Sequence, residues 1–209
     1  MRFEDWEPFY EAILTDFGYS REEDRRSARA LNGFLQPFDV SRLDAVFGGA
    51  DVSVVGNAPC LEPRDVRGDV VVAADAAARR LADAGVPVDV IVTDLDGAPR
   101  HAATESVDGT LVVVHAHGDN PDAVERWLPE FEARNVVGTT QTRPFGVLHN
   151  FGGFTDGDRA VFLADSFGAS RIRLYGFDFT DARDEKREKL RWAHRLLRVL
   201  GEERDEKLV

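Results

Sequence analysis

The chain has 209 residues, of which 43% are hydrophobic, and it carries a formal net charge of −12. This length suffices for one domain with a substantial core, or for one domain with a small appendage. The acidic balance argues against a non-specific nucleic-acid binder, whose surface carries a basic patch or stripe. An anionic small-molecule substrate stays open, because a bound divalent cation inverts the local field.

The basic residues are 23 arginines and only three lysines. Such usage is typical of a cytosolic protein from a high-salt organism, where surface charges are screened within about 3 Å at 1 M salt, or of a high-GC genome that replaces lysine with arginine. The single cysteine, Cys60, excludes an internal disulfide and a cysteine-based zinc site. The N-terminus lacks a signal-peptide pattern, and no apolar run approaches the ~18 residues of a membrane span. We therefore expect a soluble, cytoplasmic protein with no membrane partner.

Residues 1–50 are predicted to be a small helical cap on a catalytic domain formed by residues 51–209. Six apolar side chains recur at offsets of three or four before Gly18 and form one face of a first helix. Ser20 supplies the N-cap of a second helix, which should end before Pro37.

From residue 51 the hydrophobic period changes, and short β-branched runs alternate with helical stretches. The predicted strands are Val52–Val55, Val70–Ala73, Asp89–Thr93, Thr110–His115, Val136–Thr139 and Arg171–Tyr175. The predicted helices are Asp75–Ala84, His101–Val107, Pro121–Arg134, Asp158–Phe167 and Glu185–Leu200. Apolar strands separated by helices indicate a mostly parallel, Rossmann-like α/β sheet with helices on both faces. Ligands bind such sheets beyond the carboxyl ends of the strands, so the residues after each strand are the candidate site.

Two aspartates, Asp94 and Asp96, follow the third predicted strand directly. On an extended segment, residues two apart face the same way, and two unpaired carboxylates would repel each other. A Mg²⁺ ion between them removes this repulsion and gives the spacing a purpose. The alternative is a solvated acidic turn, which is common in so acidic a chain.

Three polar side chains, His115, His117 and Asp119, follow the fourth strand in an otherwise apolar stretch. Polar groups there are costly to bury without partners, so we interpret His117 and Asp119 as contacts to metal, phosphate or substrate. His115 is either such a contact or a hydrogen-bonded core histidine. Asn120 before Pro121 is a strong helix start, which favours a structural role for Asn120.

Other strand ends add further candidates. Gly56 and Asn57 follow the first strand, where a glycine either lets backbone N–H groups approach a phosphate or forms an ordinary tight turn. Asp75, after the second strand, is placed to cap the next helix, and its carboxylate also points into the ligand crevice. In the loop after the fifth strand, Thr155 and Asp158 have capping-box spacing. Side chains that suit a heterocycle or a ribose as well as a loop also follow the fifth strand: Thr139, Gln141, Asn150, Phe151 and Asp156.

With these segments assembled, the chain resembles the MptE-like family of archaeal 6-hydroxymethyl-7,8-dihydropterin diphosphokinases over roughly residues 50–200. The segments that carry the resemblance are Val55-Gly56-Asn57-Ala58-Pro59, Val92-Thr93-Asp94-Leu95-Asp96-Gly97, His115-Ala116-His117-Gly118-Asp119-Asn120 and residues 150–158. Residues 73–97 also resemble the catalytic segment of thiamin pyrophosphokinases. Ala76-Ala77 and Gly97 stand where that family has a glycine pair and a serine, which disfavours a thiamin substrate.

The resemblance implies that the β,γ-diphosphate of ATP moves to the hydroxymethyl group of 6-hydroxymethyl-7,8-dihydropterin, giving AMP, in folate or methanopterin biosynthesis. It implies that Asp94, Asp96 and Asp119 hold Mg²⁺, and that His117 accepts the hydroxymethyl proton or donates to a phosphate. The nucleotide would be approached by Gly56, Asn57 and Asp75. The pterin would be approached by Thr139, Gln141, Asn150, Phe151 and Asp156.

Three alternatives stay open beside this function. They are a thiamin-type pyrophosphokinase, a non-catalytic nucleotide-binding module, and a sugar-nucleotide-dependent glycosyltransferase-like domain, because the core is also similar to part of certain bacterial flagellin glycosyltransferases. The expected partners are ATP and a reduced pterin, and a homodimer is left open.

Two of the three lysines, Lys186 and Lys189, lie on the helix predicted after the last strand. Where arginine fills nearly every basic position, a retained lysine marks a site that needs a compact ammonium group. Our hypothesis is that Lys186 or Lys189 reaches the phosphates of ATP. The alternative is a solvated helix face.

Overall fold

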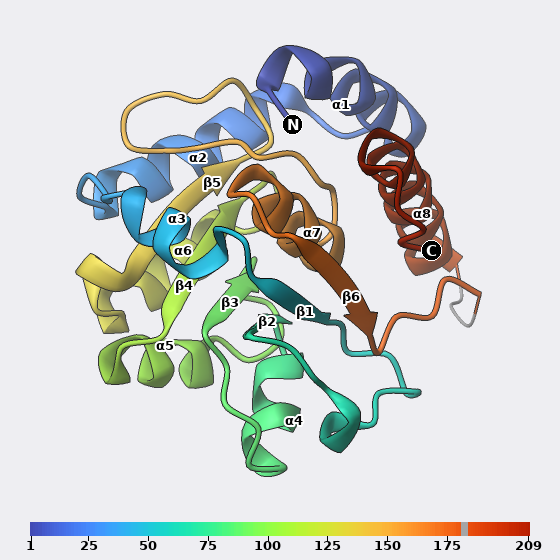
Figure 1. The fold of residues 1–209 in the computed structure, drawn as a ribbon. Helices are drawn as coiled ribbons and strands as arrows, with labels where there is room; N and C mark the ends of the chain where they lie inside the picture. Colours follow the sequence, from blue (N-terminus) through green and yellow to red (C-terminus); the bar gives the residue numbers. More distant parts are fainter. Residues whose placement is uncertain (181–183) are drawn as a thin grey trace. The chain divides into compact units, whose positions relative to one another are not determined.

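The computed structural model of the protein describes residues 1–180 and 184–209 (Figure 1). Its helices are α1 (Phe3–Phe17), α2 (Arg21–Phe34), α3 (Ser41–Phe47), α4 (Ala77–Asp83), α5 (Pro99–Asp108), α6 (Pro121–Trp127), α7 (Asp156–Ser166) and α8 (Asp184–Arg204). Its strands are β1 (Asp51–Val55), β2 (Val70–Ala74), β3 (Val90–Thr93), β4 (Leu111–Ala116), β5 (Val136–Thr140) and β6 (Arg171–Tyr175). Short 3₁₀ helices are η1 (Pro63–Asp65), η2 (Leu128–Glu130) and η3 (Ala133–Asn135).

The chain forms two compact units. The first unit consists of Met1–Asp39 and Val90–Gly152, and the second unit consists of Val40–Asp89 and Gly153–Val209. The predicted division into a cap of residues 1–50 and a catalytic domain of residues 51–209 stays a prediction.

In the first unit, β4 lies between β3 and β5 and runs parallel to both. Val90 pairs with Leu111 across β3 and β4, and Val112 pairs with Val136 across β4 and β5. α2 packs on β4, β5 and α6, while α5 packs on β4. Every residue of the three strands is buried, as expected of a parallel sheet that is covered on both faces.

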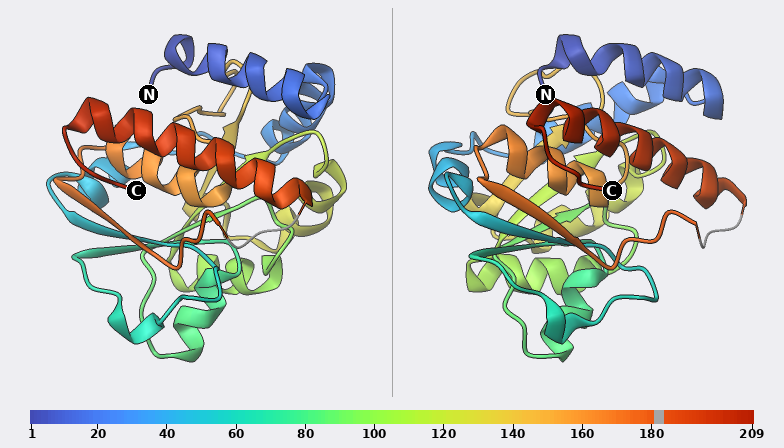
Figure 2. Two further views of the ribbon diagram at one scale, coloured as in Figure 1. Left: turned by 90° about the vertical axis from the view of Figure 1, so that its right-hand side faces the viewer. Right: turned by 45° about the vertical axis from the view of Figure 1, so that its right-hand side comes forward.

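In the second unit, β1 lies between β2 and β6 and is parallel to both. α7 packs against all three strands, and α8 packs on α7 as an outer layer (Figure 2). α4 contacts β2 from the other face of these strands (Figure 2). The buried face of α8 consists mainly of large apolar residues: Trp192, Leu196, Leu197 and Leu200. Among the helices of residues 1–180 and 184–209, none is both long and apolar enough to cross a membrane.

The strand order is β5-β4-β3 within the first unit and β2-β1-β6 within the second. Each predicted strand is present, with bounds that agree to within one residue at either end. The predicted class, a parallel α/β sheet preceded by N-terminal helices, is confirmed.

The N-terminal helices form where the periodicity predicts them. Gly18 ends α1 at a φ of +67°, a left-handed conformation that glycine adopts without steric cost, and its N–H bonds to the carbonyl of Leu14. The hydroxyl of Ser20 accepts the N–H of Glu23 at 3.4 Å, as an N-cap does. The core-facing side of α1 contains three fully buried side chains: Trp6, Tyr10 and Ile13.

Two predictions about helix ends are wrong. The helix predicted over residues 121–134 ends at Trp127, and 3₁₀ turns follow it. Pro129 explains the early end, because proline has no N–H to donate and disfavours the helical conformation in the residue before it. Asp75 does not take the N-cap position of α4, which belongs to Ala76; Asp75 precedes it at a φ of +46°.

Candidate active site

The turn after β3 brings the carboxylates of Asp94 and Asp96 together. The hydroxyl of Thr93 accepts the N–H of Leu95 at 2.9 Å, and Asp94 Oδ1 accepts the N–H of Asp96 at 3.3 Å. Leu95 lies at a φ of +72°, so the segment is a tight turn and not the extended segment predicted from the spacing. One carboxylate oxygen of each aspartate lies within 4.8 Å of the other. Two hard oxygen donors at this separation suit a divalent cation such as Mg²⁺.

His117 contacts this pair through its ring. Nε2 lies 3.2 Å from Asp94 Oδ2, and Nδ1 accepts the backbone N–H of Asp119 at 3.4 Å. A nitrogen that accepts carries no proton, so in the neutral ring Nε2 carries the proton and donates it to the carboxylate. The side chains are 22% exposed for His117 and 18% exposed for Asp94. His117 therefore orients Asp94 while part of the pair stays open to solvent.

Asp119 is exposed. Among the residues that the structure describes, its carboxylate adds no donor within 4.8 Å of both Asp94 and Asp96. The backbone of Asp119 supports the ring of His117, and the role of its carboxylate as a metal ligand stays a prediction.

Asn120 ties the loop after β4 to the turn after β3. Its Nδ2 group donates to the carbonyls of Asp94 at 2.8 Å and His115 at 2.7 Å. Its Oδ1 accepts the N–H of His117 at 3.0 Å and the hydroxyl of Ser27 at 2.9 Å. Asn120 thus has the structural role that the sequence indicated, although its contacts reach well beyond a helix start.

His115 and Thr139 are buried side by side, with exposed fractions of 3% and 6%. The Thr139 hydroxyl donates to the carbonyl of Val114 at 3.1 Å. Its oxygen lies 3.0 Å from His115 Nδ1 and, having already donated its proton, accepts the ring N–H. This favours the core-histidine interpretation of His115. A contact of Thr139 with substrate stays a prediction.

Gln141 faces a buried carboxylate that sequence reasoning did not single out. Its side-chain Nε2 lies 3.4 Å from both oxygens of Asp24, and its backbone carbonyl accepts the indole N–H of Trp6 at 2.9 Å. Asp24 also accepts the hydroxyl of Tyr10 at 2.6 Å and the N–H of Gly118 at 2.7 Å. Burial and the neighbouring Asp24 raise the pKa of Tyr10, so its hydroxyl stays protonated and donates.

Asn150 and Phe151 shape the loop after β5. Asn150 Nδ2 donates to the carbonyl of Thr140 at 2.7 Å, and Oδ1 accepts the N–H of Gly152 at 3.0 Å. The ring of Phe151 stacks on His149, with 5.6 Å between centroids and 9° between planes. Burial lowers the pKa of His149, which favours the neutral ring at neutral pH. Parallel flat rings are suited to contact with a planar heterocycle.

In the second unit, Gly56 closes β1 against the end of β6. A Cβ at Gly56 would lie 2.7 Å from the carbonyl oxygen of Gly176 and 3.3 Å from the ring of Phe177. The segments after β1 and β6 approach each other so closely that this position requires glycine. The glycine is therefore explained by packing, whether or not a phosphate also approaches it.

The loop after Gly56 is held by Arg80 of α4, which sequence reasoning also missed. The Arg80 guanidinium donates to Asn57 Oδ1 at 3.2 Å, to the carbonyl of Ala58 at 2.9 Å and to the carbonyl of Leu61 at 3.0 Å. Asn57, a candidate for nucleotide binding, is thus placed by a planar side chain with several donors.

Asp156 lies at the start of α7 and forms an ion pair with Arg159. The two side chains are 12% and 8% exposed, with 3.1 Å between Asp156 Oδ1 and Arg159 Nη1. Asp158 is fully buried and accepts the N–H groups of Phe154 and Thr155, each at 2.7 Å, so the predicted capping box is present. Burial raises the pKa of Asp158, while these hydrogen bonds act in the opposite direction.

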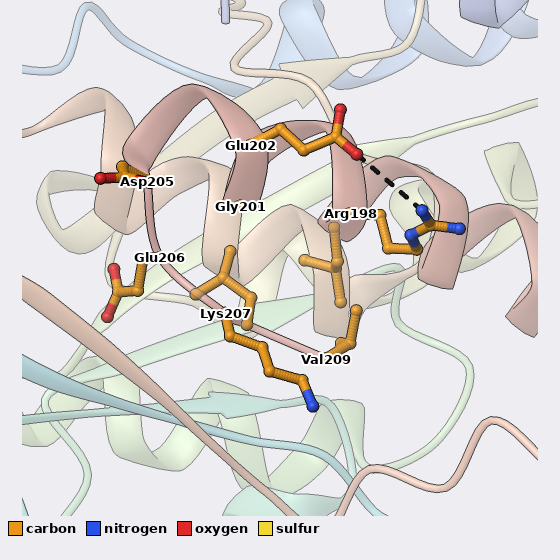
Figure 3. Close-up of a pocket in the computed structure, with 9 residues that line it drawn as sticks. Arg198, Gly201, Glu202, Asp205, Glu206, Lys207 and Val209 are labelled. Carbon is orange, nitrogen blue, oxygen red and sulfur yellow. Dashed lines mark ion pairs between the residues drawn. The ribbon is translucent and has the colours of Figure 1, made fainter.

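The remaining candidates also belong to the second unit. Asp75 directly follows β2. Lys186 is exposed and Lys189 is half-buried on α8. A cavity of about 330 Å³ lies at the other end of α8, where Lys207 and the Arg198–Glu202 ion pair line it (Figure 3). No candidate residue named from the sequence lines that cavity.

Comparison with known proteins relates this geometry to a family. The model of a family described as 6-hydroxymethylpterin diphosphokinase MptE-like matches residues 27–184. A 6-hydroxymethyl-7,8-dihydropterin pyrophosphokinase of Methanothermobacter thermautotrophicus is 44% identical over 186 residues, 86% of this chain and 79% of the relative. The chain belongs to the MptE-like family. A Pyrococcus furiosus protein of the same name is 42% identical and covers 96% of this chain and 94% of its own length. A Methanocaldococcus jannaschii protein of that name is 35% identical over 86% of this chain and 80% of the relative.

The MptE-like match separates the site residues into two groups. It includes the Asp94 turn, the His117 loop and the Asn57 loop, but it begins after Asp24 and ends before Lys186. The buried carboxylate of α2 and the lysines of α8 therefore lie outside the residues that the family model matches.

Proposed function

We propose that the chain carries out its 6-hydroxymethyl-7,8-dihydropterin pyrophosphokinase reaction with ATP as the diphosphate donor. The hydroxymethyl oxygen attacks the β-phosphorus of ATP and loses its proton. The bond between the β-phosphorus and the oxygen that bridges to the α-phosphorus breaks, and AMP leaves. The observation that carries this proposal is the carboxylate pair of Asp94 and Asp96 after β3 in a chain of this family.

The carboxylate pair is proposed to hold Mg²⁺. When bound, Mg²⁺ would neutralise charge on the phosphates. Asp94 and Asp96 supply the carboxylate oxygens that this ion prefers. Asp119 is the further carboxylate that we assign to this metal, because it follows β4 of the same unit. Asp75, after β2, is assigned to the nucleotide.

His117 is proposed to act first by orienting Asp94. Its Nε2 donates to Asp94 Oδ2, so this nitrogen has no lone pair with which to accept the hydroxymethyl proton in the observed geometry. Acceptance of that proton by His117 requires the contact with Asp94 to break first. Donation to a phosphate also requires the ring to turn away from Asp94, but it needs no change of tautomer.

We assign the nucleotide and the pterin to different loops. The nucleotide is assigned to the Gly56–Asn57 loop, with the phosphates reached by Lys186 or Lys189. The pterin is assigned to residues of the β5 end, the following loop and the start of α7: Thr139, Gln141, Asn150, Phe151 and Asp156. The stacked rings of Phe151 and His149 support this assignment. Both polar atoms of the Asn150 side chain already bond to backbone groups, so Asn150 would act by shaping the loop.

The activity of the relatives favours a pterin over the alternatives of a thiamin-type acceptor and a sugar nucleotide. A cytoplasmic location, a homodimer and a halophilic source stay predictions.

The deciding experiment incubates the protein with ATP, Mg²⁺ and 6-hydroxymethyl-7,8-dihydropterin at high salt and follows the nucleotide product. We expect AMP and the pterin diphosphate in equal amounts. Asp94→Asn and Asp96→Asn should each lower the rate by about 100-fold or more, because each removes a carboxylate charge that would hold Mg²⁺. Asp108→Asn, at an exposed acid at the end of α5, is the matched control and should keep the native rate.

Two results would contradict the proposal. ADP as the product would mean transfer of a single phosphoryl group or hydrolysis. A folded Asp94→Asn/Asp96→Asn double variant with the native rate would remove the metal assignment.

A further inference from the structure

Asp24 of α2 is a buried carboxylate on which three other segments of the first unit converge. It is 2% exposed and accepts the hydroxyl of Tyr10 at 2.6 Å and the N–H of Gly118 at 2.7 Å. Gln141 Nε2 lies 3.4 Å from each of its oxygens. Arg21 lies over the Tyr10 ring, 4.6 Å from its centroid. A carboxylate buried away from water needs hydrogen-bond donors. The directional hydrogen bonds hold the donor groups in fixed positions around it.

The bond to Gly118 is the one that reaches the candidate active site. Gly118 lies between His117, whose ring contacts Asp94, and Asp119, whose N–H supports that ring. A Cβ on Gly118 would lie 3.2 Å from the Cβ of Glu23, so α2 rests directly on the loop backbone.

A second contact from the same helix holds the far end of the loop. Ser27, three residues after Asp24, donates its hydroxyl to Asn120 Oδ1 at 2.9 Å. The same oxygen accepts the N–H of His117, and the Asn120 amide donates to the carbonyl of Asp94. Residues three apart share one face of a helix, so one face of α2 fixes the loop at two points.

We propose that Asp24 is a positioning residue for the transfer reaction, holding the His117 loop so that Asp94 is oriented for the metal. This proposal rests on the proposed function, because it assigns Asp94 to the metal. Asp24 acts through Gly118 and His117 and itself touches neither metal nor substrate. α2 thereby positions the candidate site in addition to covering β4 and β5.

The test compares two variants that damage the same network at different points. Asp24→Ala removes the acceptor of the Gly118 N–H, whereas Tyr10→Phe removes a donor to the same carboxylate and leaves the Gly118 bond in place. We expect Asp24→Ala to lower kcat and to weaken the binding of Mn²⁺ alone, followed by the electron paramagnetic resonance of the free ion, by about tenfold or more each. Tyr10→Phe should lower the melting temperature but change kcat and Mn²⁺ binding less than about twofold.

Hydrogen exchange gives a readout that is independent of metal and substrate. The amide of Gly118 should exchange faster in Asp24→Ala than in Tyr10→Phe at matched stability. Asp24→Asn, which keeps the shape and one acceptor oxygen, replaces Asp24→Ala if the alanine variant does not fold. In that case its kcat and Mn²⁺ affinity should fall between those of the native protein and Asp94→Asn.

A purely structural role for Asp24 would give equal effects on kcat and Mn²⁺ binding for Tyr10→Phe and the Asp24 variant at equal loss of stability, and this result overturns the proposal. A folded Asp24 variant with native kcat and Mn²⁺ affinity overturns it too. Asp94→Asn in the same assays distinguishes failure of the positioning role from failure of the metal assignment. If Asp94→Asn is impaired and the Asp24 variant is not, only the positioning role fails; if Asp94→Asn is native, the metal assignment itself fails.

Discussion

Leu95 separates the two carboxylates of the candidate metal site and adopts a backbone conformation that leucine rarely takes. Its φ is +72°, and its side chain is 3% exposed. The left-handed conformation costs a non-glycine residue about 1–2 kcal/mol. Burial of the leucine side chain offsets this strain. The side chain anchors the turn in the core, which leaves Asp94 and Asp96 at the edge.

Substitutions at Leu95 should show this strain directly. Leu95→Ala loses the buried side chain at a cost of about 2–5 kcal/mol and keeps the unfavourable φ. Leu95→Gly loses the same contacts but relieves the strain, so we expect it to be more stable than Leu95→Ala by about 1 kcal/mol. Urea denaturation of both variants measures the difference.

The control is Leu81, which is fully buried in α4. In a helix, alanine is favoured over glycine by about 1 kcal/mol, so Leu81→Ala should be the more stable variant of that pair. The same order of alanine and glycine at both positions would contradict a strained turn at Leu95.

Single residues also show where sequence reasoning was limited. The pair Asp94 and Asp96 was identified because both follow an apolar strand, but the assumed extended backbone was wrong because Leu95 turns the chain. Asp24 was missed because α2 reads as a polar helix. The available signal was its position on the same helical face as Ala28 and Leu31, which are both fully buried.

Among the elements, α4 determines the path of the chain after β1. Three hydrogen bonds from Arg80 hold Asn57, Ala58 and Leu61 in place. The neighbouring Arg79 is exposed and lies 3.9 Å from the exposed Asp83, a pair of the kind that contributes little to stability. Two adjacent arginines of one helix therefore have different roles.

This difference predicts a selective effect on nucleotide binding. Arg80→Lys keeps the charge but cannot reproduce the planar set of donors, so the Asn57 loop should loosen. We expect the apparent KM for ATP to rise about threefold to tenfold, equivalent to ~1 kcal/mol of binding free energy, with kcat at saturating ATP nearly unchanged. Arg79→Lys is the matched control and should behave as the native protein in the same steady-state assay.

If Arg80→Lys leaves the KM for ATP unchanged, the loop after β1 does not bind the nucleotide. A parallel loss of kcat at saturating ATP would place Arg80 in the chemical step and not in the organisation of the loop.

The elements were predicted better than their contacts. All six strands were predicted correctly because apolar β-branched runs separated by helical periods are a strong indication of strands in an α/β sheet. The end of α6 was misplaced although Pro129 signalled it. The contacts of α2 with the His117 loop and of α4 with the Asn57 loop join residues far apart in the sequence. No local pattern encodes such pairings, so they required the structure.

At the scale of the whole molecule, the balance of charges bears on how an acidic protein binds ATP. In residues 1–180 and 184–209, most of the described arginine ion pairs are exposed, such as Arg2 with Asp5, and pairs of this kind contribute little to stability. A net charge of −12 at first opposes the binding of ATP. The few lysines are therefore informative, because two of them lie on α8 and the third, Lys207, lines the cavity at its other end (Figure 3).

The three lysines provide an internally controlled test of the hypothesis that a compact ammonium group reaches the phosphates. Lys186→Arg and Lys189→Arg keep the charge and change only its shape and hydration. We expect at least one of them to weaken the binding of a non-hydrolysable ATP analogue with Mg²⁺ about threefold to tenfold, measured by calorimetry. Lys207→Arg should bind as the native protein does. If Lys186→Arg, Lys189→Arg and the double variant all keep native affinity and turnover, α8 presents a solvated face there, and the scarcity of lysine reflects the composition of the chain alone.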